Sequence, residues 1–219
     1  MRKTSFVKGE YYHIYNRGVD KRSIFEDPND LYRFLQSMRV FNTIEPNGGI
    51  YVNSFAKANL LRDLDSKLVK FITFCLNQNH YHFILQPLVD NGVQKFMHRL
   101  SLGYTLYFNE KYERSGSLFQ GPYKATHIAT NEQLLHVSAY TNLNDKVHGD
   151  LNKKWLSILP FSSFEEYKHP NGLNGICDTS IILSQFNSPE AYCQYAESVL
   201  KDIIKRKERE KSLPKLLID

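Results

Sequence analysis

The segment LVKFITFCLNQNHYHFILQP, residues 68–87, decides the fold of this 219-residue chain. Residues 68–76 and 80–87 are two runs of aromatic, β-branched and other apolar side chains, a composition typical of β-strands. Only the polar residues 77–79 separate the two runs, and a proline ends the second one. Because so short a turn brings consecutive strands side by side, the segment predicts an antiparallel β-hairpin.

The sequence on either side of the hairpin alternates between strand and helix patterns. One strand is predicted before it and one after it, at residues 11–18 and 123–129. Apolar residues at helical spacing predict helices that start at Pro28, run over 91–112 and run over 131–149, the last with its first residue as N-cap. The order β-α-β-β-α-β-α predicts an α+β fold, in which a ferredoxin-like four-stranded antiparallel sheet carries helices on one face.

The predicted elements divide the chain into a main domain and an extension. All four strands fall in residues 1–150, which we expect to form the main domain. Within it, residues 43–66 contain a proline, an asparagine and two glycines in succession, which indicates a loop or a peripheral insertion. Residues 151–219 are predicted to be a C-terminal helical extension, with a final helix from about Pro189 that ends in a basic stretch.

Composition limits the classes of protein to which the chain can belong. Its net charge of +5 and pI near 8.9 permit a nucleic-acid partner without requiring one. The three cysteines lie far apart and form no Cys-x-x-Cys pair, which argues against a zinc finger and against a disulfide scaffold. No apolar run approaches the roughly 18 residues of a membrane helix, and the N-terminus lacks the apolar core of a signal peptide. We therefore expect a cytoplasmic protein.

Two histidines on the second hairpin strand form a candidate metal site. His80 and His82 are two residues apart, and alternate residues of a strand point to the same face of a sheet. Both imidazoles therefore project together and can present two nitrogen ligands to one metal ion. The alternative interpretation is a chance His-x-His pair on a β surface. The apolar residues before and after the pair place it in the middle of a sheet, where two neighbouring histidines need a reason.

The helix predicted over 131–149 offers a nucleophile and a further ligand. Tyr140 and Asn144 are four residues apart and so share one face of that helix. If this face packs over the histidine strand, the site gains the phenol oxygen of Tyr140 and the amide oxygen of Asn144. The alternative is that Tyr140, one of 14 tyrosines, is an ordinary core aromatic residue.

The chain resembles a known family through five segments in the same order. They are YHIYNRGVDKRSIF at 12–25, FCLNQNHYHFILQP at 74–87, YTLYFNEKYERSGSLFQGPYK at 104–124, AYTNLN at 139–144 and LPFSSFEEY at 159–167. In these segments the chain is similar to the REP-associated tyrosine transposases, relatives of the single-tyrosine HUH transposases of small insertion sequences. The resemblance implies that residues 1–150 form an HUH catalytic domain.

The resemblance also implies a role for each matching residue. Tyr140 stands at the position of the nucleophile, His80 and His82 at those of two metal ligands, and Asn144 at that of the third. The implied cofactor is a divalent metal, Mg²⁺ or Mn²⁺. The sequence departs from the family in two places: Tyr81 fills the hydrophobic slot between the histidines, and Asp145 stands where the family usually has proline. His136, one helical turn before Tyr140, is a rival ligand or proton carrier.

Two clusters in the matching segments are candidates for DNA contacts. The first follows the first strand and the second surrounds the SGSLFQG turn; their members are Arg17, Lys21, Arg22, Arg114, Gln120 and Lys124. The alternative for each is the usual one for Lys and Arg, a charge exposed to solvent. If they bind DNA, phosphate contacts would supply affinity and contacts with unpaired bases would supply selectivity.

Together these features predict a transposase-like endonuclease and strand-transferase. It is expected to cut single-stranded DNA that carries a hairpin formed by a repeat sequence, through a 5′-phosphotyrosine, and to associate with the nucleoid when bound to DNA. One alternative is a DNA-hairpin-binding protein of the same fold in which catalysis is weak or lost. Another is a metal-dependent phosphodiesterase that uses water in place of Tyr140. The sequence is compatible with a homodimer and with a monomer.

Overall fold

The computed structural model describes residues 4–45, 67–148, 162–170, 172 and 175–212. Most of the predicted insertion at 43–66 and the start of the extension lie outside these residues. None of the described helices is both long enough and apolar enough to cross a membrane.

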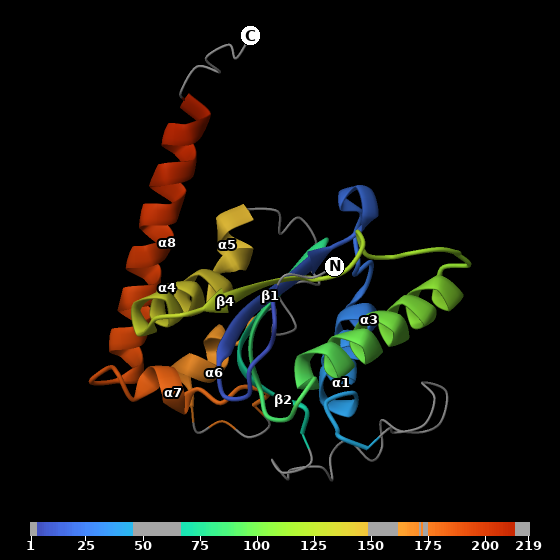
Figure 1. The fold of residues 1–219 in the computed structure, drawn as a ribbon. Coiled ribbons are helices and arrows are strands. Elements are labelled where there is room, and N and C mark those ends of the chain that lie inside the picture. Colours follow the sequence, from blue (N-terminus) through green and yellow to red (C-terminus); the bar gives the residue numbers. More distant parts are fainter. Residues whose placement is uncertain (1–3, 46–66, 149–161, 171, 173–174, 213–219) are drawn as a thin grey trace.

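The four predicted strands form one antiparallel sheet (Figure 1). They are β1 (Tyr11–Arg17), β2 (Val69–Asn77), β3 (His80–Pro87) and β4 (Lys124–Ile128). Their order is β2-β3-β1-β4, so the first strand lies between β3 and β4. The hairpin of β2 and β3 is present, with Asn77 opposite His80 at its turn. The predicted α+β fold with a ferredoxin-like sheet is confirmed.

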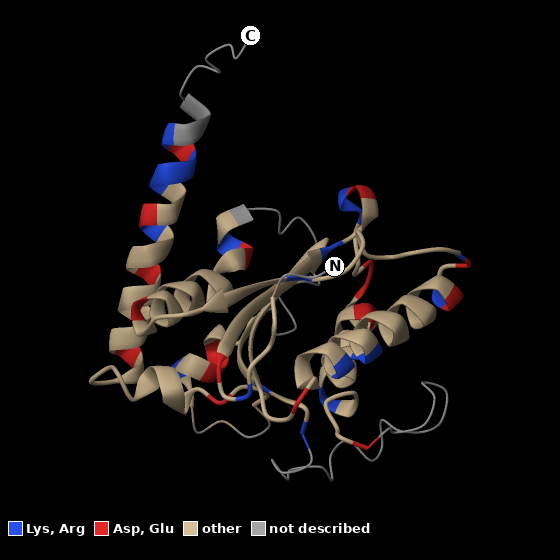
Figure 2. Cartoon of the chain, in the orientation of Figure 1, with Lys and Arg blue, Asp and Glu red and all other residues tan. Residues whose placement is uncertain are grey.

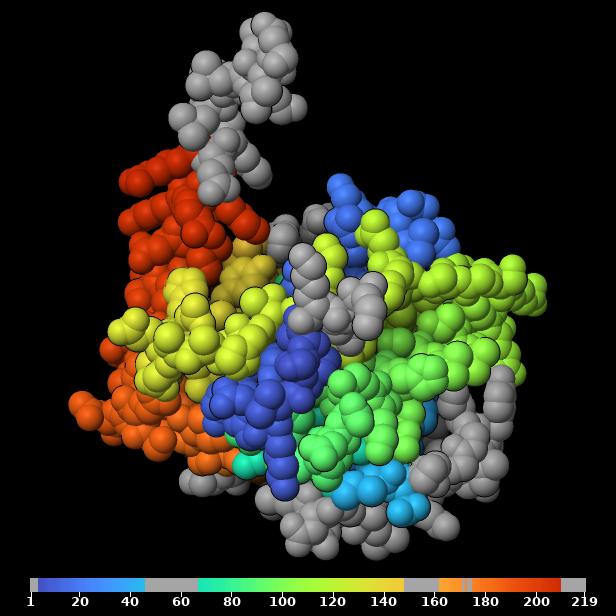
Figure 3. All heavy atoms as spheres, viewed as in Figure 1, coloured from blue at the N-terminus to red at the C-terminus, as the bar shows by residue number. Residues whose placement is uncertain are grey.

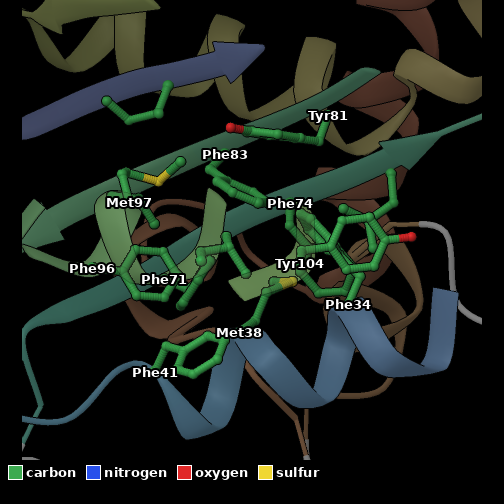
Figure 4. Packing of buried hydrophobic residues seen from close by; sticks show 14 of the residues in the cluster. Phe34, Met38, Phe41, Phe71, Phe74, Tyr81, Phe83, Phe96, Met97 and Tyr104 are labelled. Atoms are coloured by element: carbon green, nitrogen blue, oxygen red, sulfur yellow. The ribbon is translucent and has the colours of Figure 1, made fainter. Parts of the chain in front are cut away.

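One face of the sheet packs against α1 (Pro28–Val40) and α3 (Gly92–Lys111). Phe34 and Met38 of α1 meet the side chains that β2 and β3 direct to this face, as Figure 4 shows. Helix α1 starts at Pro28 because the Asp27 carboxylate accepts a hydrogen bond from the backbone N–H of Asp30. This apolar layer is the larger core of the molecule and fixes the sheet on which the histidine strand lies.

The other face of the sheet is also covered by helices (Figure 1). Ile72 and Ile84 of the sheet share a second core cluster with residues of α4, α6 and α8, among them Ala139, Tyr167 and Tyr192. The helices on this side are α4 (Asn131–Asn142), α5 (Asn144–His148), α6 (Phe164–Lys168), α7 (Ser180–Leu183) and α8 (Pro189–Ser212). Helices on one face were expected, and α1 and α3 provide them. The predicted helical C-terminal extension is present, and its described part packs on the second face beside α4 (Figure 3).

The helix predicted over 131–149 is divided into two. Leu143 leaves the helical conformation, with φ −112° and ψ 17°, so α4 ends at Asn142 and α5 starts at Asn144. The N-cap is Thr130, whose side chain accepts from the backbone N–H of Gln133, and not Asn131 as predicted. The predicted end of the helix at Gly149 lies outside the described residues. Because of this division, Asn144 is the first residue of α5 and does not continue the helix that carries Tyr140.

Candidate active site

A pocket of about 800 Å³ opens beside the turn of the β2–β3 hairpin. Its walls come from β1 and the loop after it, from the hairpin turn, from the segment before β4 and from α5. The lining residues are Tyr15, Asn16, Arg17, Lys21, Ser23, Asn77, Gln78, Asn79, His80, His82, Gln120, Lys124 and Asp145. Both histidines of the predicted metal site and four of the six predicted DNA-binding residues are among them.

His80 and His82 lie on one face of β3, as their spacing predicted. Their ring centroids are 5.2 Å apart. His82 is buried, with 7% of its surface exposed, and His80 is half-buried. Their face of the sheet is the one that α4 covers, because the other face of β3 carries Tyr81 and Phe83 into the larger core. The two imidazoles therefore lie between the sheet and the helix that bears Tyr140.

Each histidine is held through its Nδ1 atom. Nδ1 of His80 lies 2.6 Å from Oδ1 of Asn79, and an amide oxygen can only accept, so this nitrogen of His80 carries the proton. Nδ1 of His82 lies 2.9 Å from Nε2 of His13. Burial lowers the pKa of His13 to about 4, so this ring is neutral at neutral pH and can accept from His82. With His82 as the donor, a metal ion would bind each of the two histidines through Nε2.

Asn144 meets His80 at the start of α5. Its Oδ1 atom lies 3.1 Å from Nε2 of His80, and Asn144 is fully buried. Atoms bound to one octahedral cation at about 2.1 Å lie about 3 Å apart, so this pair has the separation of two neighbouring ligands. Within the described residues, no group of three or more His, Cys, Asp or Glu side chains is arranged to hold a metal ion. A metal ion held by the two histidines would have the amide oxygen of Asn144 as a further protein ligand.

Tyr140 reaches the same place from the last turns of α4. Its ring stands edge-on to His82, with centroids 5.6 Å apart, and to His13, with centroids 6.2 Å apart. Burial raises the pKa of Tyr140, and the side chain of Asn144 beside it lowers that pKa in part. Tyr140 also packs against the second core cluster, so the core interpretation is partly right. Tyr140 thus lies beside His82 and His13, although it is not among the residues that line the pocket.

The predicted DNA-binding residues divide into two groups. Arg17, Lys21, Gln120 and Lys124 line the pocket, and the Arg17 guanidinium donates a hydrogen bond to the side-chain oxygen of Gln120. Arg22 and Arg114 are not lining residues. Nε of Arg22 donates to the backbone oxygen of Val19, whereas Arg114 donates to Asn109 and lies over the ring of Phe108. Figure 2 shows a basic and an acidic position on the short helix η1 (Val19–Lys21), beside the end of β1.

The two departures from the family pattern have different consequences. Tyr81 is buried in the larger core and stacks on Phe83 with ring centroids 4.7 Å apart, so its bulk points away from the pocket. Asp145 lines the pocket, and burial raises the pKa of its carboxyl group. His136, the rival ligand, is exposed and is not a lining residue of the pocket.

Three residues of the site were not predicted from the sequence. His13 contacts His82 from β1, Asn77 contacts His80 from the end of β2, and Asn79 contacts His80 from the hairpin turn. The turn residues were interpreted only as a turn. Alternation along β1 offered a signal for His13, because Tyr11, His13, Tyr15 and Arg17 share one face of that strand. The pairing of Tyr15 with His82 brings this face beside the histidines.

Residues 52–144 match the family of IS200-like transposases. The IS200-like segment contains the β2–β3 hairpin, α3, β4, α4 and Asn144 at its last position. The resemblance to tyrosine transposases inferred from the sequence is confirmed. No curated protein matches the chain.

A solved structure has the same fold as this chain. It is that of a REP-associated tyrosine transposase bound to a REP hairpin. The superposition has a TM-score of 0.53 and 14% sequence identity, and covers 82% of this chain and 92% of the other. The similarity therefore extends beyond the IS200-like segment to most of the molecule, including part of the C-terminal region.

Proposed function

We propose that this protein is a transposase that cuts and rejoins single-stranded DNA, with Tyr140 as nucleophile. The observation that carries the proposal is the meeting of α4–α5 with β3. Tyr140 lies edge-on to His82 while Asn144 contacts His80, so a nucleophile and three candidate ligands come together. All four residues belong to the segment that matches the IS200-like transposases.

The site has the donor atoms for a divalent metal. His80 and His82 would hold the metal through Nε2, and Asn144 would hold it through Oδ1. A ligand set of imidazole nitrogens and an amide oxygen suits Mn²⁺, and it also accepts Mg²⁺ where water molecules complete the coordination shell. When bound, the metal supplies positive charge that offsets the charge developing on the scissile phosphate. Tyr140 needs such help, because a phenol has an ordinary pKa near 10 and burial raises the pKa of this one.

The proposed reaction conserves the energy of the broken bond. The phenol oxygen of Tyr140 loses its proton and attacks phosphorus. A bond from Oη to phosphorus forms, the bond from phosphorus to the 3′ oxygen breaks, and that oxygen leaves and takes up a proton. The 5′ phosphate stays on Tyr140 until a 3′-hydroxyl attacks it, which restores the tyrosine and joins the strands without ATP.

The pocket suits unpaired DNA. Arg17, Lys21 and Lys124 supply positive charge for phosphates at its wall. Tyr15, also a lining residue, brings an aromatic ring to the wall of the pocket, with the Lys124 ammonium 6.0 Å from its ring centroid. Aromatic rings and basic groups together suit single-stranded nucleic acid. The solved transposase of the same fold is bound to a REP hairpin. We therefore propose single-stranded DNA with a hairpin as the substrate.

The test is a covalent-adduct assay. Labelled hairpin DNA is incubated with the protein and Mn²⁺ and then separated under denaturing conditions. The proposal expects a labelled adduct in the wild type and in Tyr32→Phe, an exposed tyrosine on α1, and none in Tyr140→Phe. Binding without an adduct in the wild type would instead indicate a hairpin-binding protein. Cleavage that survives Tyr140→Phe would indicate a hydrolase that uses water.

A further inference from the structure

Asn77, the last residue of β2, contacts both His80 and Asn144. Its Nδ2 atom donates to Nε2 of His80 at 3.0 Å and to Oδ1 of Asn144 at 2.9 Å. The third side of the triangle, from His80 to Asn144, is 3.1 Å. Asn77 is buried with 8% exposure, and it lines the pocket. One terminal atom of Asn77 is therefore in contact with both members of the pair that would bind the metal.

The chemistry of the three groups determines which atom of Asn77 faces the other two. In the neutral ring of His80, Nε2 is an acceptor, because Nδ1 donates to Asn79. Oδ1 of Asn144 is an acceptor as well. Two acceptors 3.1 Å apart repel each other, and the amino group of Asn77 relieves this repulsion by donating to both. The carboxamide of Asn77 thus holds the pair together in the protein alone.

A cation bound by His80 and Asn144 would reverse this requirement. Any third atom in the triangle would then need a lone pair directed at the cation. The three sides of 2.9, 3.0 and 3.1 Å equal the roughly 3 Å edge of an octahedron with ligands at about 2.1 Å. A half-turn about the Cβ–Cγ bond of Asn77 exchanges its amide nitrogen and oxygen, which have nearly the same size.

One further neighbour of the Asn77 carboxamide is Cys75, the residue two positions before it on β2. Besides His80 and Asn144, Nδ2 of Asn77 contacts Sγ of Cys75 at 3.8 Å. Cys75 is a fully buried free cysteine. A thiol sulfur accepts weakly from an N–H, and its S–H donates weakly to an oxygen. Because His80 and Asn144 take both N–H bonds of Asn77, Cys75 adds only a weak contact before the half-turn, and its S–H can donate to the carbonyl oxygen after it.

From this geometry we propose that Asn77 is a further metal ligand, which binds through Oδ1 after its carboxamide turns over. The inference rests on the proposed metal site of His80, His82 and Asn144. It gives Asn77 two roles, as the hydrogen-bond donor that joins His80 to Asn144 without metal and as an oxygen ligand with metal. It also adds a second amide oxygen to the ligand set, which shifts the preference of the site toward the harder cations Mn²⁺ and Mg²⁺.

The test measures Mn²⁺ binding without DNA, from the electron paramagnetic resonance signal of free Mn²⁺. Asn77→Leu removes the oxygen and keeps a side chain of similar size. It is expected to weaken Mn²⁺ binding about 100-fold, which is the upper end of the losses that follow when a residue that supports a metal ligand is removed. Asn77→Asp keeps an oxygen and is expected to bind at least as tightly as the wild type. Gln78 is the matched control position, because its amide lines the same pocket but donates to Ser23. Gln78→Leu is expected to bind like the wild type, and Gln78→Glu measures the effect of an added charge alone.

The possible results distinguish the role of Asn77 as a ligand from the proposed metal site and from the proposed function. Binding by Asn77→Asp that is as weak as that of Asn77→Leu would limit Asn77 to hydrogen bonding and overturn the inference, as would wild-type affinity in Asn77→Leu. Tighter binding by Gln78→Glu, equal to the gain in Asn77→Asp, would also overturn it. A wild-type protein that binds no Mn²⁺ would remove the metal site itself. Binding as expected without a phosphotyrosine adduct would leave Asn77 as a ligand and overturn only the proposed function.

Discussion

Asn142 on α4 donates a 2.8 Å hydrogen bond from Nδ2 to the phenol oxygen of Tyr192 on α8. Both residues are fully buried. The other amide atom of Asn142, Oδ1, accepts from the hydroxyl of Ser163, and that hydroxyl accepts from the backbone N–H of Phe74 on β2. Asn142 therefore ties α4 to α8 on one side and to the sheet on the other. Tyr140 is two residues away, so the C-terminal helix helps to set the position of the proposed nucleophile.

Tyr192→Phe should lower stability, since it leaves the buried Nδ2 of Asn142 without its acceptor. The loss of one such hydrogen bond costs about 1–3 kcal/mol. For a chain of this size that corresponds to a melting temperature lower by roughly 2–4 °C for each kcal/mol. The control is Tyr195→Phe, half-buried on the same helix. Calorimetry that gives both variants the same melting temperature would contradict the assigned role of Tyr192.

A second prediction concerns His13, which accepts from Nδ1 of His82 if His82 binds metal through Nε2. His13→Phe keeps a ring but removes the acceptor, and is expected to weaken Mn²⁺ binding by about 10–100-fold. His13→Gln, whose carbonyl oxygen can accept, should recover part of the loss. Tyr15→Phe, on the same face of β1, should change little. The measurement is a Mn²⁺ titration; equal affinities in His13→Phe and His13→Gln would show that the acceptor is not what matters.

Local signals in the sequence were sufficient for the elements that carry the site. The hairpin could be predicted because apolar strand residues flank a short polar turn, and α3 because its apolar residues recur at helical spacing. The division of the helix at Leu143 has no such signal, since the residues around it include neither Pro nor Gly. It follows from tertiary contacts, in which Asn142 bonds to Tyr192 and Ser163 while Asn144 bonds to Asn77 and lies against His80.

The supporting residues of the site were beyond prediction for a related reason. His13 is 69 positions from His82 in the chain, and only the register of β1 against β3 brings the two together. Asn77 is close to His80 in sequence, but its link to Asn144 spans 67 positions. The helices that cover the second face of the sheet likewise pack through residues that are far apart in the sequence. Ile84 of β3 and Tyr192 of α8, for example, belong to the same hydrophobic cluster. Residue type and spacing could identify His80, His82 and Tyr140, but not the groups that orient them.

The basic residues of the pocket give a third prediction. Arg17→Ala and Lys124→Ala should each weaken binding of single-stranded hairpin DNA and reduce the slope of log affinity against log salt by about 0.7–0.9, as expected for one lost phosphate contact. Arg114→Ala is the control, because Arg114 is held by Asn109 and Phe108 and does not line the pocket. Fluorescence anisotropy at several salt concentrations measures both quantities. An equal change of slope in Arg114→Ala would remove the pocket from the DNA interface.

The last prediction concerns Lys111, which joins the end of α3 to the start of α1. Its ammonium group contacts Asp27 at 2.6 Å and Asp30 at 2.7 Å, and the Asp30 side chain is fully buried. Lys111→Met leaves that buried carboxylate without its cation, for which a loss of about 3 kcal/mol in unfolding free energy is expected. Urea denaturation measures the loss, and Lys95→Met, an exposed lysine on the same helix, should unfold like the wild type.

The pH dependence of the same variant tests the cause of this loss. Partial burial raises the pKa of Asp27, but the hydrogen bond from Lys111 and those from backbone N–H groups lower it more, so the pKa lies below its ordinary value. A carboxyl group with a lowered folded-state pKa stabilises the fold above its ordinary pKa of 3.8, and this stabilisation is lost as pH falls through the folded-state value. Lys111→Met removes one cause of the lowering. Its unfolding free energy should therefore decrease less than that of the wild type when the pH is lowered below 4, and a parallel decrease in both proteins would contradict the assignment.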